Sequence, residues 1–231
     1  MTADTRALKH AAALKAIEYV REGMVLGLGT GSTAEYAVRE LGDRVRQGLR
    51  ITGVPTSDRT AALARELGIP LTSLEENPHL DLTIDGADEV VLSTLDVVKG
   101  LGGALLREKI VALASGTEIL IVDESKVVSR LGDKTAVPVE VVAFGWGAAR
   151  SALEALGCEP TRRSDKGGQP YVTDSGNYLL DCKFPGIAEP AQLARKIKQI
   201  TGVVEHGIFA GIACTVVVAR QDGVQVYDRE A

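Results

Sequence analysis

The stretch Met24-Val-Leu-Gly-Leu-Gly-Thr-Gly-Ser-Thr33 decides how this chain folds. Its first half is a short apolar run of the kind that forms a buried strand. A turn of glycine, threonine and serine follows, and helical spacing of apolar residues begins at Thr33. A buried strand that runs through a glycine-rich turn into a helix is the first half of a βαβ unit. The stretch therefore predicts a parallel sheet at the centre of the fold.

The same alternation of strands and helices continues on both sides of this stretch. The predicted strands are residues 24–28, 51–54, 69–71, 80–84 and 118–122, and the predicted helices are residues 4–21, 33–41, 57–67 and 101–114. Apolar strands that alternate with helices are typical of a sheet covered on both faces. We predict an α/β fold with a doubly wound, mainly parallel, Rossmann-like sheet. Residues 1–132 plus 207–231 are expected to form this domain and to hold the catalytic site.

The pattern changes after Gly132. It predicts a strand at 138–142, a helix at 146–156, a hairpin of residues 169–173 and 177–181, and a helix at 190–200. Later strands are expected at 203–204, 212–219 and 224–227, some of them returning to the first sheet. A strand, a helix, a hairpin and a helix within a short segment indicate a split-βαβ unit. We predict a smaller α+β, ferredoxin-like lid domain over residues 133–206.

Composition limits the classes of function. The 231 residues carry a formal net charge of −5, which argues against a nucleic-acid surface because such a surface needs a basic patch. Charged residues recur through the first 20 positions, unlike a signal peptide or a membrane span, so we expect a cytoplasmic protein that binds no membrane.

The cysteines and histidines are not spaced as metal ligands usually are. Cys158, Cys182 and Cys214 are far apart and indicate neither a disulfide framework nor a zinc site, so we predict three buried thiols. The three histidines, His10, His79 and His206, are equally scattered. No bound metal is expected.

The turn Gly27-Leu-Gly-Thr-Gly-Ser-Thr33 is suited to binding one phosphate group. Backbone N–H groups and the positive end of a helix dipole converge there. A dinucleotide fingerprint fails because Ser32 occupies its last glycine position, and a Walker loop fails because no Gly-Lys-Ser/Thr follows. A plain turn with Ser32 or Thr33 as a helix N-cap remains an alternative that needs no ligand.

Charged groups crowd the stretch from Asp85-Gly-Ala-Asp88 to Lys99-Gly-Leu-Gly-Gly103 and Glu108. Asp85 follows an apolar strand and should lie at the carboxyl edge of the sheet, where open α/β sheets bind ligands. At 100° per residue, Glu108 shares a helix face with Ala104, Val111 and Ala112, which would partly desolvate it and suit it to act as a base. A solvated glutamate on an outward face is the alternative.

Lysines near the same edge could balance the charge of an anion. Lys99 precedes the glycines, and Lys126 follows a further strand. Lys9 in the first helix gives a weaker indication. Ordinary surface lysines are the alternative for all of them.

Together these stretches resemble ribose-5-phosphate isomerase of the A type. The matching motifs, in the order and approximate spacing of that family, are Gly27-Leu-Gly-Thr-Gly-Ser-Thr33, Asp85-Gly-Ala-Asp-Glu89, Lys99-Gly-Leu-Gly-Gly-Ala104 with Arg107-Glu-Lys-Ile110, Asp123-Glu-Ser-Lys126 and Pro138-Val-Glu-Val141. The similarity runs from the first helix to the end of the chain.

The resemblance implies reversible interconversion of D-ribose 5-phosphate and D-ribulose 5-phosphate, a step of the non-oxidative pentose phosphate pathway, without a metal or organic cofactor. It implies a homodimer or a homotetramer. It also implies Glu108 as the catalytic base, with Asp85, Asp88 and Lys99 as further catalytic groups. The implied substrate-binding residues are Lys9, Thr30, Gly31, Ser32, Thr33, Asp85, Gly86, Ala87, Asp88, Lys99, Gly100, Leu101, Gly102 and Lys126.

A mechanism follows as a hypothesis. Glu108 would move a proton from C2 to C1 through a cis-enediol(ate), while Lys99 and the N–H groups of residues 100–103 stabilise the developing charge. Asp85 and Asp88 would handle hydroxyl protons during ring opening. A sugar-phosphate sensor domain and an acyl transferase that uses coenzyme A remain the alternatives.

Overall fold

The computed structural model describes residues 3–229. The chain forms two compact units. The first unit contains the chain up to Ala87, Arg107–Val127 and the chain from Ile212 onward, and the second contains Asp88–Leu106 and Val128–Gly211. The chain therefore passes between the units inside the Asp85-Gly-Ala-Asp88 motif and again just before Glu108.

A six-stranded sheet forms the centre of the first unit, in the order β13-β12-β6-β3-β1-β2. The strands from β12 to β2 are parallel, and β13 pairs antiparallel with β12. Their bounds are β1 (Val25–Leu28), β2 (Thr52–Pro55), β3 (Leu80–Gly86), β6 (Ser115–Asp123), β12 (Thr215–Arg220) and β13 (Gly223–Asp228). The predicted strand at 69–71 is reduced to a single bridge between Leu71 and Gly53.

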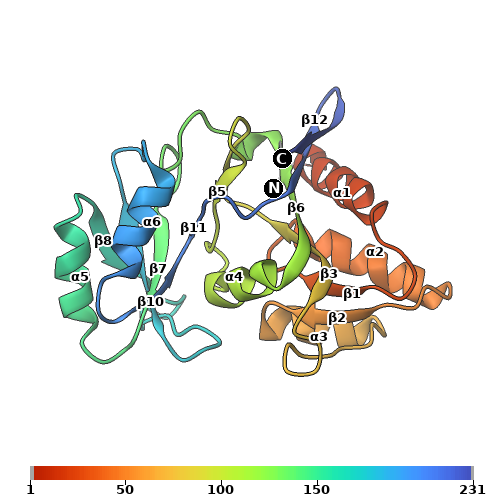
Figure 1. Cartoon of the computed structure of the whole chain (residues 1–231), viewed down its shortest axis with the longest axis horizontal. Helices are drawn as coiled ribbons and strands as arrows, with labels where there is room; N and C mark the ends of the chain where they lie inside the picture. Colours follow the sequence, from red (N-terminus) through yellow and green to blue (C-terminus); the bar gives the residue numbers. More distant parts are fainter. Residues whose placement is uncertain (1–2, 230–231) are drawn as a thin grey trace. The chain divides into compact units, whose positions relative to one another are not determined.

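Helices cover both faces of this sheet, as Figure 1 shows for α2 and α4 on opposite sides of β3. Leu26 and Leu28 of β1 share a buried cluster with α1 and α2, whereas Gly27 between them faces Val111 of α4. Side chains alternate along a strand, so the two faces receive different helices. The helices are α1 (Ala3–Ile17), α2 (Ala34–Arg46), α3 (Asp58–Glu66) and α4 (Leu105–Leu113), with a 3₁₀ turn at Glu124–Lys126. This confirms the predicted doubly wound α/β fold.

The strand order reverses at β1, which pairs with β2 on one side and with β3 on the other. Such a reversal opens a crevice at the carboxyl ends of the strands, where α/β proteins bind ligands. The turn at 29–33 follows β1, and Asp85 lies at the end of β3. Both motifs therefore flank the switch point of the sheet.

The second unit contains a four-stranded antiparallel sheet, in the order β10-β7-β9-β8. Its elements follow one another as β-α-β-β-α-β, which is the ferredoxin-like arrangement predicted from the sequence. They are β7 (Val137–Val141), α5 (Trp146–Glu154), β8 (Glu159–Arg162), β9 (Tyr178–Lys183), α6 (Pro190–Lys198) and β10 (Val203–His206). A further small sheet joins β11 (Ile208–Phe209), β5 (Asp96–Val98) and β4 (Glu89–Val91).

The predicted hairpin differs from the structure. Strand β9 pairs with β8, and Val172 of the predicted partner makes only an isolated bridge to Tyr178. Strand β8 carries Pro160 and lies at the edge of its sheet, the position where a strand tolerates proline. Its polar sequence gives no alternation of apolar residues, which is why the sequence did not indicate it.

The units also differ from the predicted domain bounds. Residues 88–106, 128–132 and 207–211 were expected in the larger domain but group with the second unit. The reason is the small sheet, in which β5 pairs with both β4 and β11. Within residues 3–229, no helix is long and apolar enough to cross a membrane.

Gly27 offers a test of the close packing between β1 and α4. A Cβ at this position would lie 1.8 Å from Thr83 Oγ1 and 2.6 Å from Val111 Cγ1. We expect Gly27→Ala to lower the free energy of unfolding by about 1–3 kcal/mol, because these neighbours cannot both move aside. Thermal melting measures the effect.

Gly147→Ala is the control, because Gly147 lies in helix α5 and nothing is within 4 Å of an added Cβ. That variant should melt at or above the wild-type temperature, since alanine favours helix by about 1 kcal/mol over glycine. A Gly27→Ala protein as stable as wild type would contradict the packing described here.

Candidate active site

Asp85 fastens the turn after β1 to the end of β3. Its buried carboxylate Oδ1 accepts hydrogen bonds from the backbone N–H of Thr30 at 3.0 Å and of Gly86 at 2.7 Å. Gly29 approaches so closely that a Cβ there would lie 2.4 Å from Asp85 Oδ1. The glycine is required at this point because no side chain fits between the two strands.

The hydroxyl of Thr30 belongs to a buried cluster that sequence reasoning missed. Thr30 Oγ1 lies 2.7 Å from Thr56 Oγ1, 2.8 Å from Ser57 Oγ and 3.1 Å from Thr60 Oγ1. Ser57 is the N-cap of α3, and its side chain accepts from the backbone N–H of Thr60. The signal in the sequence is the N-cap pattern Ser57-x-x-Thr60 directly after β2. The cluster ties the turn to a neighbouring strand and helix.

The start of α2 remains available to an anion. Thr33 occupies the N-cap position but makes no side-chain capping hydrogen bond. The alternative of a turn closed by a Thr33 cap is therefore wrong for that residue. A helix N-terminus of this kind presents N–H groups and a positive dipole end.

Lysines lie close to this helix start. Lys9 is buried, and its Nζ donates to Ser32 Oγ at 2.8 Å. Burial lowers the pKa of Lys9, Asp123 partly opposes the shift, and the nearby charge of Lys126 adds to it. Asp123 also caps the 3₁₀ turn that carries Lys126, through the backbone N–H of Ser125 at 3.0 Å. Lys9, Ser32 and Lys126 thus gather donors and positive charge, which suits a phosphate group.

Glu108 lies on the buried face of α4 and is 3% exposed. Leu105, Val111 and Ala112 are buried with it, while Ile110 and Leu113 on the other side are 47% and 67% exposed. The alternative of a solvated glutamate on an outward face is therefore wrong. The carboxylate is held away from bulk water, as the apolar neighbours in the sequence predicted.

In the second unit, Asp88 and Lys99 frame the glycine turn. Asp88 Oδ2 accepts from the backbone N–H of Leu101 at 2.9 Å. Lys99 is 2% exposed, its backbone N–H donates to Gly207 O at 2.8 Å, and its Nζ lies 5.6 Å from the centre of the Phe209 ring. The ring face attracts the ammonium group. Lys99 is buried, so the surface alternative is wrong.

The turn at 100–103 has fewer available donors than the sequence suggested. Leu101 N–H is taken by Asp88, and Gly103 N–H donates to Gly100 O at 3.0 Å. Gly100 and Gly103 have φ values of 105° and 86°, which is why glycine stands at both positions. Arg163, which sequence reasoning missed, donates to the carbonyl groups of Gly100 and Leu101.

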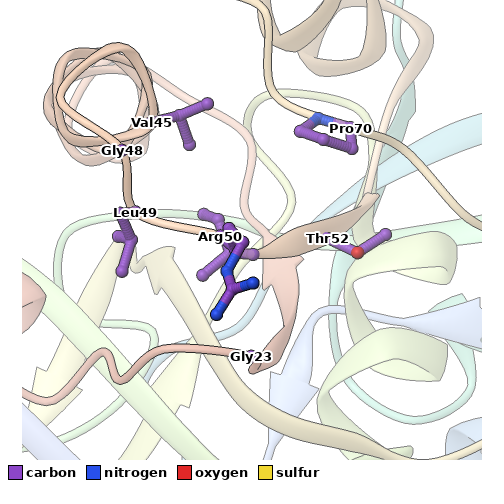
Figure 2. A pocket seen from close by; sticks show the side chains of 8 residues that line it. Gly23, Val45, Gly48, Leu49, Arg50, Thr52 and Pro70 are labelled. Carbon is purple, nitrogen blue, oxygen red and sulfur yellow. The ribbon is translucent and has the colours of Figure 1, made fainter.

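A separate hollow of about 470 Å³ lies at the opposite, amino-terminal ends of β1 and β2 (Figure 2). Its charged residue, Arg50, donates through its backbone N–H to Glu22 Oε2 at 3.0 Å and pairs through Nε with Glu22 Oε1. These bonds hold the pKa of Glu22 below its usual value. The hollow shares no residue with the predicted site.

The sequence predicted no bound metal and three buried thiols. Among the residues that the structure describes, no three His, Cys, Asp or Glu side chains come together in a way that could hold a metal ion. The three cysteines are free thiols; Cys158 and Cys182 are buried, and Cys214 is half-buried rather than buried as predicted.

The fold is that of an α/β protein, and the start of α2 with Lys9 and Ser32 is an arrangement suited to a small phosphorylated molecule. Residues 52–223 match the family model described as ribose 5-phosphate isomerase A (phosphoriboisomerase A). The chain belongs to this family.

Known proteins resemble the chain over nearly its whole length. "Ribose-5-phosphate isomerase A" of Gloeobacter violaceus is 55% identical over 96% of both chains, and that of Gluconobacter oxydans is 49% identical over 97% of this chain and 98% of its own. The structure of ribose 5-phosphate isomerase A from Methanocaldococcus jannaschii superposes with a TM-score of 0.94 at 40% identity, covering 97% of this chain and all of the other. A D-ribose-5-phosphate isomerase solved in complex with phospho-erythronic acid gives 0.95 at 39% identity, over 99% and 100%.

Lys9 provides a test of the anion site. We expect Lys9→Met to weaken binding of inorganic phosphate about tenfold or more, because a hydrogen bond to a charged group contributes about 1.5–3 kcal/mol. Since the pKa of Lys9 is lowered from 10.5, wild-type affinity should fall as pH rises through that lowered value. Lys9→Met should lack this alkaline component. Titration calorimetry from neutral to alkaline pH measures both.

Lys15→Met is the matched control, because Lys15 lies on the same helix, is exposed and pairs with Glu18. It should bind phosphate as wild type does. Equal phosphate affinity in the Lys9 and Lys15 variants would show that Lys9 does not hold the anion.

Proposed function

We propose that this protein interconverts D-ribose 5-phosphate and D-ribulose 5-phosphate as an aldose-ketose isomerase of the non-oxidative pentose phosphate pathway. The observation that carries the proposal is similarity over nearly the full chain, at about half identity, to proteins of that name. The burial of Glu108 and the Lys9–Ser32 contact at the start of α2 support the proposal, because they would supply the base and the phosphate anchor that this reaction needs. No relative supports the sensor or acyl-transferase alternative.

Glu108 is the proposed catalytic base. It takes the proton from C2 of the open-chain aldose and returns it to C1, while the electron pair moves through a cis-enediolate. One carboxylate can serve both carbons because they are adjacent. Its burial removes competing water and favours transfer to carbon.

Groups around the reacting carbons would stabilise the developing charge. Lys99, buried and cationic, and the N–H groups still available in the turn at 100–103 would face the enediolate oxygens. Asp85 and Asp88 each hold a backbone N–H, and a carboxylate has further acceptor positions. Those positions would take hydroxyl protons during ring opening, beside Gly86 and Ala87.

The phosphate would be anchored by the start of α2 and the lysines. Gly31, Ser32 and Thr33 supply the turn, and Lys9 and Lys126 supply charge. The hydroxyl of Thr30 is held in its cluster and its N–H by Asp85, so Thr30 would act by fixing the shape of the turn. Binding energy from a group remote from C1 and C2 orients the substrate for reaction.

The wider setting is proposed from composition and family. The net charge of −5 makes a small sugar phosphate a better partner than a nucleic acid. We propose a cytoplasmic enzyme, a homodimer or homotetramer, that needs no cofactor.

The direct test is conversion of ribose 5-phosphate to ribulose 5-phosphate with EDTA present. We expect activity unchanged by the chelator, because the proposed base and charge-stabilising groups are all side chains and backbone of this chain. A coupled assay or NMR of the sugar carbons measures it. Absence of conversion would contradict the proposed function, and loss on chelation restored by a metal would contradict metal independence.

Glu108→Gln tests the proposed base. The amide is nearly isosteric, so we expect ribose 5-phosphate to bind with little change while kcat falls about 10²- to 10⁴-fold, the usual contribution of a positioned base. Steady-state kinetics and calorimetry separate the two quantities. Glu66→Gln, at an exposed position of α3, is the control and should match wild type. A Glu108→Gln enzyme within about threefold of wild-type kcat would remove Glu108 from this role.

A further inference from the structure

Arg163 holds the glycine turn at 100–103 by hydrogen bonds to two of the turn's backbone carbonyl groups. Its NH1 donates to Gly100 O at 3.1 Å and to Leu101 O at 3.0 Å. One nitrogen therefore fixes two consecutive peptide groups. Arg163 itself lies outside the family motifs, whereas Gly100 and Leu101 belong to one of them.

The positions of these carbonyl groups determine where the next N–H groups point. A trans peptide group is planar, with its C=O and N–H in opposite directions, and every peptide bond within residues 3–229 is trans. The Gly100–Leu101 peptide is held at both ends, by Arg163 and by Asp88. In the Leu101–Gly102 peptide the carbonyl points to Arg163, so the N–H of Gly102 points away from it.

Gly102 N–H is therefore the donor whose direction Arg163 sets. Gly102 is exposed, and among the described residues no group accepts this N–H. The N–H groups of Leu101 and Gly103 are already engaged. The turn thus presents an oriented donor on the side opposite Arg163.

Arg163 is itself rigidly held. Its Nε donates to Asp181 Oδ2 at 2.9 Å and its NH2 to Asp181 Oδ1, a two-pronged pairing that a lysine cannot make. Its Cζ lies 5.9 Å from the centre of the Tyr171 ring. The hydroxyl of Tyr171 would lie 2.2 Å from a Cβ on Gly103, so the ring also packs against the turn.

We infer that Arg163, held by Asp181, is a positioning residue that aims the Gly102 N–H at the oxygen on which enediolate charge develops. This inference rests on the proposed function. A donor fixed in advance stabilises developing charge without reorganisation, and misplacement by about 1 Å costs about 10²-fold in rate. Arg163 acts through the backbone and does not touch the substrate.

Arg163→Met removes the guanidinium while keeping an apolar side chain of similar length. We expect kcat for ribose 5-phosphate to fall about 10- to 100-fold with KM changed less than about threefold. Affinity for phospho-erythronic acid, whose planar carboxylate imitates the enediolate, should fall in parallel with kcat/KM. Affinity for inorganic phosphate should not change. Kinetics and calorimetry give these four quantities.

Arg162→Met is the matched control. Arg162 precedes Arg163 in the chain, but its guanidinium lies over Trp146 at 4.5 Å and over Tyr178 at 5.6 Å. It should keep wild-type kcat and ligand affinities. The inference would be overturned if Arg163→Met and Arg162→Met had kcat values within about threefold of each other and affinities for phospho-erythronic acid within about threefold of each other. Equal losses of phospho-erythronic acid and inorganic phosphate binding would also overturn it, since they indicate general damage.

If Arg163→Met does not fold, Arg163→Lys tests the inference in its place. Lysine retains one cationic donor for the carbonyl groups but loses the paired contact to Asp181. We expect an intermediate kcat, and a wild-type kcat would overturn the inference. An inactive wild-type protein would contradict the proposed function. The positioning role is tested separately, because loss of phospho-erythronic acid binding in Arg163→Met can be measured without any catalytic turnover.

Discussion

The hydrogen bond from Thr30 N–H to the buried carboxylate of Asp85 is the constraint on which the edge of the large sheet depends. A buried carboxylate is strongly disfavoured unless donors surround it, and a glycine turn in this conformation needs an acceptor for its N–H groups. When β1 and β3 lie side by side, the turn after β1 donates to the carboxylate of Asp85, so the carboxylate gains a donor and the turn gains an acceptor. The approach leaves no room for a side chain at Gly29. The glycine at position 29 and the aspartate at position 85 therefore both serve this one contact between the ends of β1 and β3.

Asp88, the second aspartate of the Asp85-Gly-Ala-Asp88 motif, makes the same kind of hydrogen bond in the other unit. Asp88 accepts the N–H of Leu101 just as Asp85 accepts that of Thr30. The chain passes from one unit to the other between these aspartates, after Ala87. Each unit therefore has its own glycine turn held by its own carboxylate. This gives Asp88 a definite structural task and separates it from the proposed base, Glu108.

The sequence predicted those parts of the site that depend on local order along the chain. The turn after β1, the strand before Asp85 and the apolar neighbours of Glu108 are all local patterns, and the structure contains them. Strand β8 was not predictable because its polar sequence with a proline follows no strand period. The contact of Arg163 with Gly100 joins residues 63 positions apart, and the contact of Thr30 with Ser57 joins residues 27 apart. Such contacts form only when the strands have taken their positions in the sheets, so no local pattern in the sequence predicts them.

Buried lysines would let a chain of net charge −5 hold the phosphate group that the proposed function requires. Burial disfavours an ammonium group, so lysines are rarely enclosed without compensation. Lys9 has Ser32 and the nearby Asp123, and Lys99 has the face of Phe209, which attracts a cation without neutralising it. A phosphate dianion would restore to Lys9 part of the stabilisation that the ammonium group lost on leaving water. Under the proposed function, selectivity for a phosphorylated molecule would arise from these buried lysines rather than from the overall charge, which repels anions at longer range.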